Sequence, residues 1–369
     1  MLKKNLFFSL FAGLLLLTAC APEESAAKAK DIPKMVLADG EYEKVPLEKN
    51  DVILKLIQNS VENIEKPEDA PKVIKNNLDK VTKLIKQACT EGEKPNIILL
   101  HEFPLTGYIY GNRTEKLSIS LKIPGPESDA ISLLAKEYDT YIIFGSYAQD
   151  ADWPGHVLSL TTVIGRNGEI VKKVWKPRNI KRFYSSFEIT TTTVEGVKDR
   201  FREKYGVMEE FPVIRTEYGN IAVSTAQLDP FVFAAFAMQG AEIFLRTSTM
   251  FFENDVINMS MINNVFSAMA NIPAESKYGG NSMVVSPFGE VIARMDRTSE
   301  GVLEATLPMA KFRKGRKLPQ FSLDLTRDVF DQFEEEVPAN HLDIPEIELP
   351  KDGREMKALI DSKSRWLNQ

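Results

Sequence analysis

The stretch from residue 214 to residue 250 constrains the fold of this chain more than any other. After the turn pair Gly219-Asn220 comes Ile221-Ala-Val-Ser-Thr, a short apolar run typical of a buried strand. Asp229-Pro230 then marks the start of a helix, because Asp can cap free N–H groups and Pro lacks the N–H that the first helical turn leaves unpaired. Residues 231–238 form the apolar helix, and Ala241-Glu-Ile-Phe-Leu-Arg begins a second strand. A strand, a helix and a strand in so short a stretch indicate an α/β fold.

The same alternation of strands and helices runs through much of the chain. Residues 71–89 repeat apolar side chains at intervals of three and four, which predicts an amphipathic helix. Asn96-Ile-Ile-Leu-Leu is apolar throughout, as expected for a strand that is covered on both faces. Further strands are expected at 52–57, 141–147, 158–164, 169–174 and 301–306, a hairpin at 281–294, and helices at 129–138 and 255–269.

Composition excludes several classes of function. The net charge of −6 and the lack of a basic cluster argue against nucleic-acid binding. Three histidines and two cysteines are too few for a zinc site with several ligands or for a disulfide framework, so no metal site is expected. The chain has no glycine-rich phosphate-binding loop either, and we expect it to need no cofactor.

The first twenty residues have the pattern of a targeting segment. Lys3 and Lys4 precede an apolar run over residues 6–17 that is too short to span a bilayer as a helix. Leu17-Thr-Ala-Cys20 follows and resembles the lipobox of bacterial lipoproteins, in which the cysteine is lipidated; the alternative is an ordinary secretory signal. We therefore expect a protein of the bacterial cell envelope, anchored to a membrane through lipid on Cys20 and facing the periplasm or the exterior. Residues 21–49 are expected to form a tether.

Three segments together resemble the nitrilase, or carbon–nitrogen hydrolase, superfamily, and are most similar to its aliphatic-amidase and formamidase branch. They are Ile97-Ile-Leu-Leu-His-Glu-Phe-Pro-Leu-Thr-Gly-Tyr108, Gly168-Glu-Ile-Val-Lys-Lys-Val-Trp-Lys176 and Ala237-Met-Gln-Gly-Ala-Glu-Ile-Phe-Leu-Arg246. The resemblance implies a four-layer α-β-β-α sandwich over residues 50–310, in which two mixed sheets pack face to face. Residues 311–369 would form a C-terminal arm, and family members usually form homodimers or larger homo-oligomers.

The resemblance also implies a set of catalytic residues. In this family a cysteine thiolate attacks an amide or nitrile carbon, a glutamate transfers protons and a lysine stabilises the developing oxyanion. Glu102 matches the glutamate and Lys176 matches the lysine. Glu188 is the candidate for a second glutamate of the family, with Glu195 and Glu203 as competitors.

The cysteine of the family is missing from its expected place. Counting forward from the strand at 221–223 places it at Ala226, and counting back from Pro230 and Gly240 places it at Ser224. The difference of two residues indicates a deletion in the connection itself. Ser224 could act as a substitute nucleophile only with a base strong enough to remove its proton, and no histidine belongs to this segment.

The sequence therefore predicts a lipoprotein related to the amidases that lacks the nucleophile. The leading hypothesis is a degenerate amidase that binds a small amide- or amine-containing ligand, or a protein partner, without covalent turnover. The alternative is an active amidase that hydrolyses non-peptide C–N bonds with another nucleophile, such as Ser224.

Overall fold

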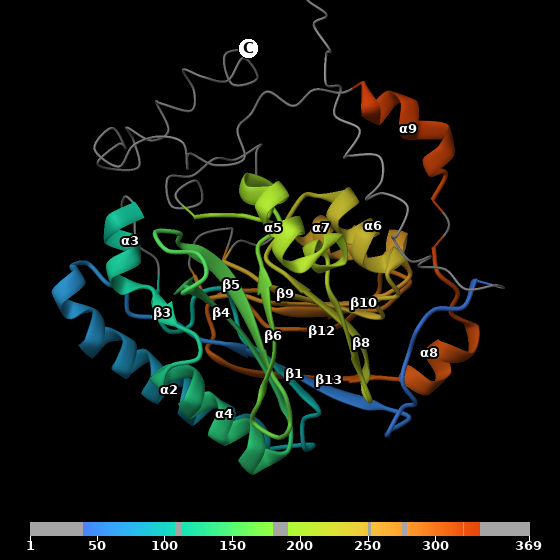
Figure 1. Ribbon diagram of the computed structural model, residues 1–369. Helices are drawn as coiled ribbons and strands as arrows, with labels where there is room; N and C mark the ends of the chain where they lie inside the picture. Colours follow the sequence, from blue (N-terminus) through green and yellow to red (C-terminus); the bar gives the residue numbers. More distant parts are fainter. Residues whose placement is uncertain are drawn as a thin grey trace, which may run out of the picture. The chain divides into compact units, whose positions relative to one another are not determined.

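The computed structural model describes residues 40–107, 113–179, 191–249, 252–274, 279–319 and 321–332. All of them belong to one unit, residues 35–369. Within it, two β-sheets pack face to face and helices cover their outer faces (Figure 1). The four-layer α-β-β-α arrangement predicted from the sequence is confirmed.

The first sheet has the strand order β13-β1-β2-β4-β5-β6, and β3 pairs with the far end of β4. Its central strands β1, β2 and β4 are parallel, whereas β5, β6 and β13 run antiparallel to their neighbours, so the sheet is mixed. The strands are β1 (Val52–Gln58), β2 (Ile97–Leu99), β3 (Leu121–Lys122), β4 (Tyr141–Gln149), β5 (Leu158–Ile164), β6 (Ile170–Trp175) and β13 (Gly301–Leu307).

The second sheet has the order β12-β11-β10-β9-β8-β7, with β8, β9 and β10 parallel and the others antiparallel. Its strands are β7 (Val213–Thr216), β8 (Gly219–Ser224), β9 (Ile243–Thr247), β10 (Phe266–Ala270), β11 (Met283–Val285) and β12 (Val291–Arg294). The parallel strands β8, β9 and β10 end at the same edge of the sheet, and the connections that follow β8 and β9 lie there.

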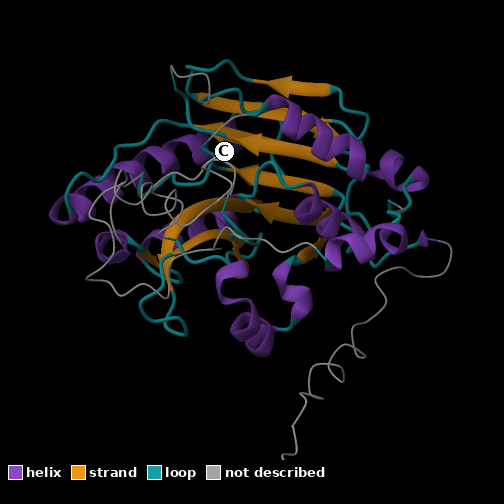
Figure 2. Ribbon diagram, turned by 90° about the horizontal axis from the view of Figure 1, so that it is seen from above, coloured by secondary structure: helices purple, strands orange, loops and turns teal. Residues whose placement is uncertain are grey.

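Helices α2 and α4 pack on the outer face of the first sheet, and α6 and α7 on that of the second (Figures 1 and 2). The helices are α2 (Ala70–Thr90), α3 (Arg113–Ile119), α4 (Pro126–Tyr138), α5 (Lys198–Tyr205), α6 (Pro230–Met238), α7 (Glu253–Asn263), α8 (Met309–Gly315) and α9 (Leu323–Asp331), with single 3-10 turns η3 (Pro67–Asp69), η4 (Glu195–Val197) and η5 (Val207–Glu210). Among the described residues, no helix combines the length and the apolar character that crossing a bilayer requires.

The alternation of side chains along each strand explains how the hydrophobic layers between and outside the sheets are built. Leu54 and Leu56 of β1 join a cluster between the sheets together with Ile221 and Val223 of β8. The intervening Ala222 faces the opposite way and packs with α6 and α7. Because side chains alternate across a strand, each apolar strand contributes to two hydrophobic layers at once, which is why these runs have no polar face.

The sequence prediction of one helix over residues 255–269 is wrong in its second half. The helix α7 ends at Asn263, and Asn264 adopts the left-handed conformation that commonly terminates helices. Residues 266–270 instead form β10, paired with β9 and β11. Phe266, Ala268 and Ala270 face the first sheet, and Met269 faces α7, so side chains alternate between the two faces as in a strand. The run is apolar nearly throughout, and such a run is also compatible with a helix.

Both segments that flank the expected domain contact it. Tyr42, in the expected tether, is buried and donates a hydrogen bond to the fully buried Glu242 at 2.6 Å. Arg313, in the expected C-terminal arm, donates two hydrogen bonds to the same carboxylate at 2.8 and 2.7 Å. The packed part of the chain thus extends on both sides of residues 50–310, because the charge of Glu242 is satisfied by the two flanking segments.

Candidate functional site

Glu102 lies just beyond the C-terminal end of β2 and has only 2% of its surface exposed. Two hydroxyl groups donate hydrogen bonds to its carboxylate. Ser159 Oγ on β5 lies 3.3 Å from Oε1, and Thr249 Oγ1, just after β9, lies 2.9 Å from Oε2. A buried carboxylate is costly unless it is hydrogen-bonded, so these hydroxyls hold Glu102 in one orientation.

Lys176 lies next to Glu102, so the two residues that were matched to the family's lysine and glutamate lie in one place. It follows β6 directly, is 3% exposed, and its Nζ lies 3.5 Å from Glu102 Oε1. Its backbone N–H donates to Ser159 O on the neighbouring strand at 3.0 Å, which continues the β5–β6 pairing beyond the end of β6. An ammonium and a carboxylate are thereby held together in a place that water barely reaches, where opposite charges attract more strongly than in water.

The pair lies where the two sheets meet. Ser248, after β9 of the second sheet, accepts a hydrogen bond from the backbone N–H of Glu102 at 3.5 Å. Nearby, Thr161 Oγ1 on β5 and Thr247 Oγ1 on β9 are 3.1 Å apart, which bridges the sheets through side chains. The site is therefore built from both sheets, and its geometry depends on how they pack.

Gly145 on β4 makes the position of Glu102 possible. A Cβ atom added at Gly145 would lie 2.3 Å from Glu102 O and 2.7 Å from Glu102 Cα. No side chain fits at that distance, so only glycine allows the backbone of Glu102 to pass so close to β4. The N–H of Gly145 also donates to His101 O at 3.1 Å, which fixes the same segment.

His101, directly before Glu102, has a structural position. It is fully buried, and its Nδ1 accepts a hydrogen bond from the backbone N–H of Phe103 at 3.3 Å. Burial lowers the pKa of His101 from 6.5 to about 3, so the ring is neutral at ordinary pH. The neutral ring holds the backbone on either side of Glu102.

Ser224 and Ala226, the two candidate positions for the family cysteine, lie at the end of β8. Ser224 Oγ accepts a hydrogen bond from the N–H of Ala226 at 3.0 Å. Ser224 lines a space with Phe233 and Phe236 of α6 that is too small to admit a water molecule. Both candidate side chains are buried on the α6 side, with Ala226 in the cluster beneath α6 and α7.

A buried polar network shapes the connection after Ala226. Arg246, at the end of β9, donates to Gln227 Oε1 at 2.8 Å and to Asp255 Oδ2 on α7 at 2.6 Å. Burial lowers the pKa of the Arg246 guanidinium, and the charge of Asp255 opposes this shift. Asp255 also accepts from the N–H of Leu228, which has a positive φ of 52°. The network thus holds a tight, strained turn between β8 and α6.

A family model for carbon-nitrogen hydrolases matches residues 70–317 of this chain. The chain belongs to the carbon-nitrogen hydrolase family. Among its relatives, a probable nitrilase of Schizosaccharomyces pombe is 23% identical over 69% of this chain and 92% of its own length. The omega-amidase NIT2-A of Xenopus laevis is 24% identical over 69% of this chain and 91% of its own length.

Solved structures of the family share the fold. A carbon-nitrogen hydrolase from Helicobacter pylori G27 superposes with a TM-score of 0.58 at 17% identity, over 77% of this chain and 99% of its own. An amidase from Nesterenkonia sp. gives a TM-score of 0.56 at 14% identity, over 77% of this chain and 98% of its own. At these identities the likeness concerns the fold alone.

Other residues considered for this carbon-nitrogen hydrolase lie elsewhere. Cys89 is the cysteine within the described ranges, and it packs at the end of α2 against the first sheet's outer cluster. Burial raises the pKa of its thiol to about 11. Cys20 and Glu188 lie outside the described residues. Within the described ranges, no three or more His, Cys, Asp or Glu side chains gather as metal ligands would.

Several residues of the site were not singled out from the sequence of this family member. Ser159 and Thr249 bind the carboxylate of Glu102, and Arg246 and Asp255 support the turn after β8. The sequence does contain a sign of them: Ser159 and Arg246 are polar residues inside otherwise apolar strands, and a buried polar group needs a hydrogen-bond partner. Which partner it finds depends on the pairing of strands distant in sequence.

Proposed function

We propose that this carbon-nitrogen hydrolase family member binds a small amide- or amine-containing ligand at Glu102 and Lys176 without covalent turnover. The observation that carries the proposal is the buried ion pair, with Lys176 Nζ 3.5 Å from Glu102 Oε1. An amide offers a carbonyl oxygen that an ammonium binds and N–H groups that a carboxylate binds. Relatives named as omega-amidase and nitrilase are in keeping with a ligand of this class.

Turnover would need a nucleophile, and the residues at the end of β8 do not supply a thiol. Ala226, the position matched by counting along the strand, carries a methyl group that cannot attack a carbonyl carbon. Cys89 belongs to α2, and the raised pKa of its thiol keeps the reactive thiolate scarce at neutral pH. We therefore favour a degenerate amidase that retains the Glu102–Lys176 pair for binding.

The alternative is an active amidase that uses Ser224 as its nucleophile. Ser224 lies on the α6 side of β8, whereas Val223, next to it, packs between the sheets. Its hydroxyl accepts a hydrogen bond from the N–H of Ala226, and the space beside it is lined by phenylalanine rings and by Arg246, whose guanidinium does not accept a proton. A serine hydroxyl needs an adjacent base to become nucleophilic, so this environment favours binding over turnover.

The first experiment measures binding and turnover on the same panel of small aliphatic and aromatic amides. We expect a saturable rise in the melting temperature of the wild-type chain with some amides and no release of ammonia. Glu102→Gln and Lys176→Met should abolish the rise. Lys172→Met, on β6 but paired with Glu209 at the surface, is the matched control and should leave it unchanged. Ammonia release that Glu102→Gln abolishes would establish the amidase alternative instead.

A second experiment restores the thiol. If Ala226→Cys releases ammonia from an amide that the wild-type chain only binds, the remainder of the site is competent and only the nucleophile is missing. If neither Ala226→Cys nor Ser224→Cys does so, the turn held by Arg246 and Asp255 has itself been rebuilt around the lost residues. In both cases binding by the wild-type chain stands as a separate measurement.

We also propose that the protein is anchored in the bacterial cell envelope through lipid on Cys20. The support is the Leu17-Thr-Ala-Cys20 motif behind a short apolar segment. Metabolic labelling with a fatty-acid analogue should mark the wild-type chain and not Cys20→Ala. Labelling that persists in Cys20→Ala, or none in either chain, would contradict the anchor.

A further inference from the structure

A groove of about 610 Å³ opens between the β11–β12 hairpin, the end of α7 and α8. Sites for small molecules usually have a volume of about 300–1,000 Å³, so the groove has the size of such a site. None of the residues that line it takes part in the site around Glu102. We call it the hairpin groove.

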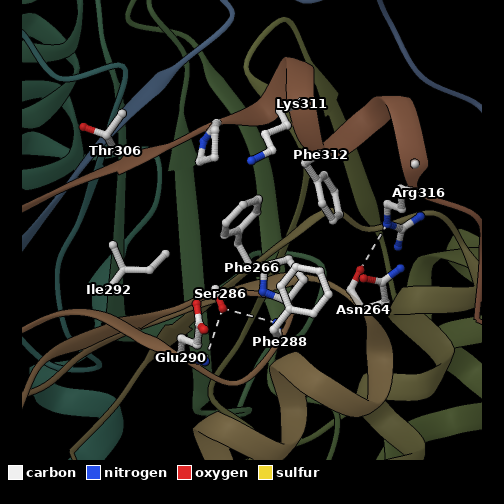
Figure 3. A pocket seen from close by; sticks show the side chains of 13 residues that line it. Asn264, Phe266, Ser286, Phe288, Glu290, Ile292, Thr306, Lys311, Phe312 and Arg316 are labelled. Carbon is white, nitrogen blue, oxygen red and sulfur yellow. Dashed lines mark hydrogen bonds between the residues drawn. The ribbon is translucent and has the colours of Figure 1, made fainter.

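Three aromatic rings make the middle of the hairpin groove apolar (Figure 3). Phe266 on β10 is almost completely buried, and Phe312 on α8 packs edge to face against it, with 5.1 Å between the ring centroids. Phe288, in the hairpin turn, is 80% exposed and within the described ranges makes no ring contact with either of them. An apolar ligand body that packs between Phe288 and Phe312 would therefore remove both rings from water, which is favourable.

Hydrogen bonds hold the turn that carries Phe288. Ser286 Oγ accepts from the N–H groups of Phe288 and Glu290, both at 3.2 Å. The backbone of Ser286 adds two bonds, because its N–H donates to Glu290 O at 2.8 Å and its carbonyl accepts from the N–H of Gly289 at 2.9 Å. The turn is thus ordered before any ligand arrives, so binding need not supply the free energy to order it.

Two charges lie on different sides of the rings. Lys311 extends from α8 above them, and Glu290 extends from the hairpin on the other side (Figure 3). Within the described ranges, neither side chain has a hydrogen bond or an ion pair. Arg313 on the same helix differs, since it is paired with the buried Glu242. Lys311 and Glu290 are therefore available to a ligand.

We infer that the hairpin groove binds a small zwitterionic ligand with an apolar body, such as an apolar peptide of two or three residues. The ligand carboxylate meets Lys311 Nζ, its ammonium meets the Glu290 carboxylate, and its apolar side chains lie against Phe288 and Phe312. One cation and one anion on different sides of an apolar centre are complementary to such a molecule. A ligand with negative charge at both ends, by contrast, would be repelled by Glu290.

The test is a calorimetric titration of the full-length chain with the peptides Leu-Phe and Leu-Gly-Phe, which differ in length by about 3.5 Å. At about pH 6.5 both peptide termini are charged. We expect saturable binding of at least one peptide. Its N-acetyl form, which lacks the ammonium, and its form with phenylethylamine in place of phenylalanine, which lacks the carboxylate, should each bind about two- to fivefold more weakly, as expected for exposed ion pairs.

Variants of the chain then assign each end of the peptide to one residue. Lys311→Met should bind the peptide and its form without the carboxylate equally, while still preferring the free ammonium. Glu290→Gln should bind the peptide and its N-acetyl form equally, while still preferring the free carboxylate. Phe288→Ala should weaken the binding of all three molecules. A loss of preference at one end only does not arise from misfolding, and equal melting temperatures of the free variants check the fold.

Two further variants serve as controls. Lys314→Met removes an exposed lysine of α8 that does not line the groove, and it should bind the peptide as wild type does. Glu102→Gln disables the amide site proposed above and should also bind the peptide as wild type does. The failure of one site is thereby separated from the failure of the other.

Three results would overturn the inference. One is that neither peptide binds saturably. Another is that the forms without a charged end bind as tightly as the peptide itself. The third is that Lys311→Met and Glu290→Gln keep the wild-type preference for both charged ends, because the peptide would then bind elsewhere on the chain.

Discussion

Arg246 Nη1 lies 2.6 Å from Asp255 Oδ2, which joins the end of β9 to the first turn of α7 beneath the turn that follows β8. The same helix carries a second ion pair, between Glu253 and Arg294, at the surface. Arg246 is almost completely buried, whereas Arg294 is about one-third exposed. One helix thus presents a buried and an exposed ion pair two residues apart.

The buried pair should matter far more for stability than the exposed one. We expect Asp255→Asn to lower the free energy of unfolding by about 3–5 kcal/mol, because it leaves the Arg246 charge buried without its counterion. Glu253→Gln should change it by less than about 1 kcal/mol, since water screens the exposed pair. Urea denaturation of the two variants measures both values. Equal losses would show that burial does not set the strength of these pairs.

Gly145→Ala should displace Glu102. The added methyl group would lie 2.3 Å from Glu102 O, so the β2 connection or β4 must move. We expect a loss of about 1–3 kcal/mol in the free energy of unfolding, as for overpacking elsewhere. The amide-induced rise in melting temperature should also be smaller. Gly315→Ala, at the end of α8 with no atom within 4 Å of the added Cβ, is the control and should be neutral.

His101 should make the folded state sensitive to acid. Because burial lowers its pKa from 6.5 to about 3, the unfolded chain binds a proton between these values that the folded chain does not. The contribution of His101 is therefore constant above pH 6.5, and stability falls by about 1.4 kcal/mol per pH unit as the pH drops toward 3. His101→Asn keeps an acceptor for the N–H of Phe103 but does not titrate.

The comparison of wild type with His101→Asn isolates this effect from the titration of carboxylates, which both chains share. Unfolding by urea at several pH values between 4 and 6.5 should give a steeper fall for wild type. Parallel curves would mean that His101 is protonated in the folded chain.

The N-terminal boundary can be tested by truncation. A chain that begins at residue 40 keeps the hydrogen bonds of Tyr42 to Glu242 and of Arg313 to Val45 O, at 2.6 Å each. A chain that begins at residue 50 loses both, along with the bond from Asn220 to Glu43 O at 2.7 Å. Glu242 keeps its hydrogen bonds from Arg313 in the shorter chain. With about 1 kcal/mol for each of the three lost bonds, we expect the shorter chain to melt several degrees lower. Identical melting temperatures would show that residues 40–49 do not stabilise the fold, as a domain that starts at residue 50 predicts.

The sequence predicted the elements well where local pattern decides them. The helix predicted at 71–89 is α2, and the strands predicted at 158–164 and 169–174 are β5 and β6, because apolar patterns act over a few residues. The pattern failed at 255–269, where Phe-Ser-Ala-Met-Ala suits either a helix or a strand. Only pairing with β9 and β11 made it a strand, and that interaction is not local.

The sequence by itself determined the fold class, the family and the candidate pair Glu102 and Lys176, because short motifs carry that information. The tertiary structure alone decided what surrounds the pair. Thr249 and Ser159, which bind the Glu102 carboxylate, lie 147 and 57 residues from it along the chain. Such contacts depend on the order of strands in two sheets and on how the sheets pack. The physical reason is that a buried charge must be satisfied by whichever groups the packed core brings to it.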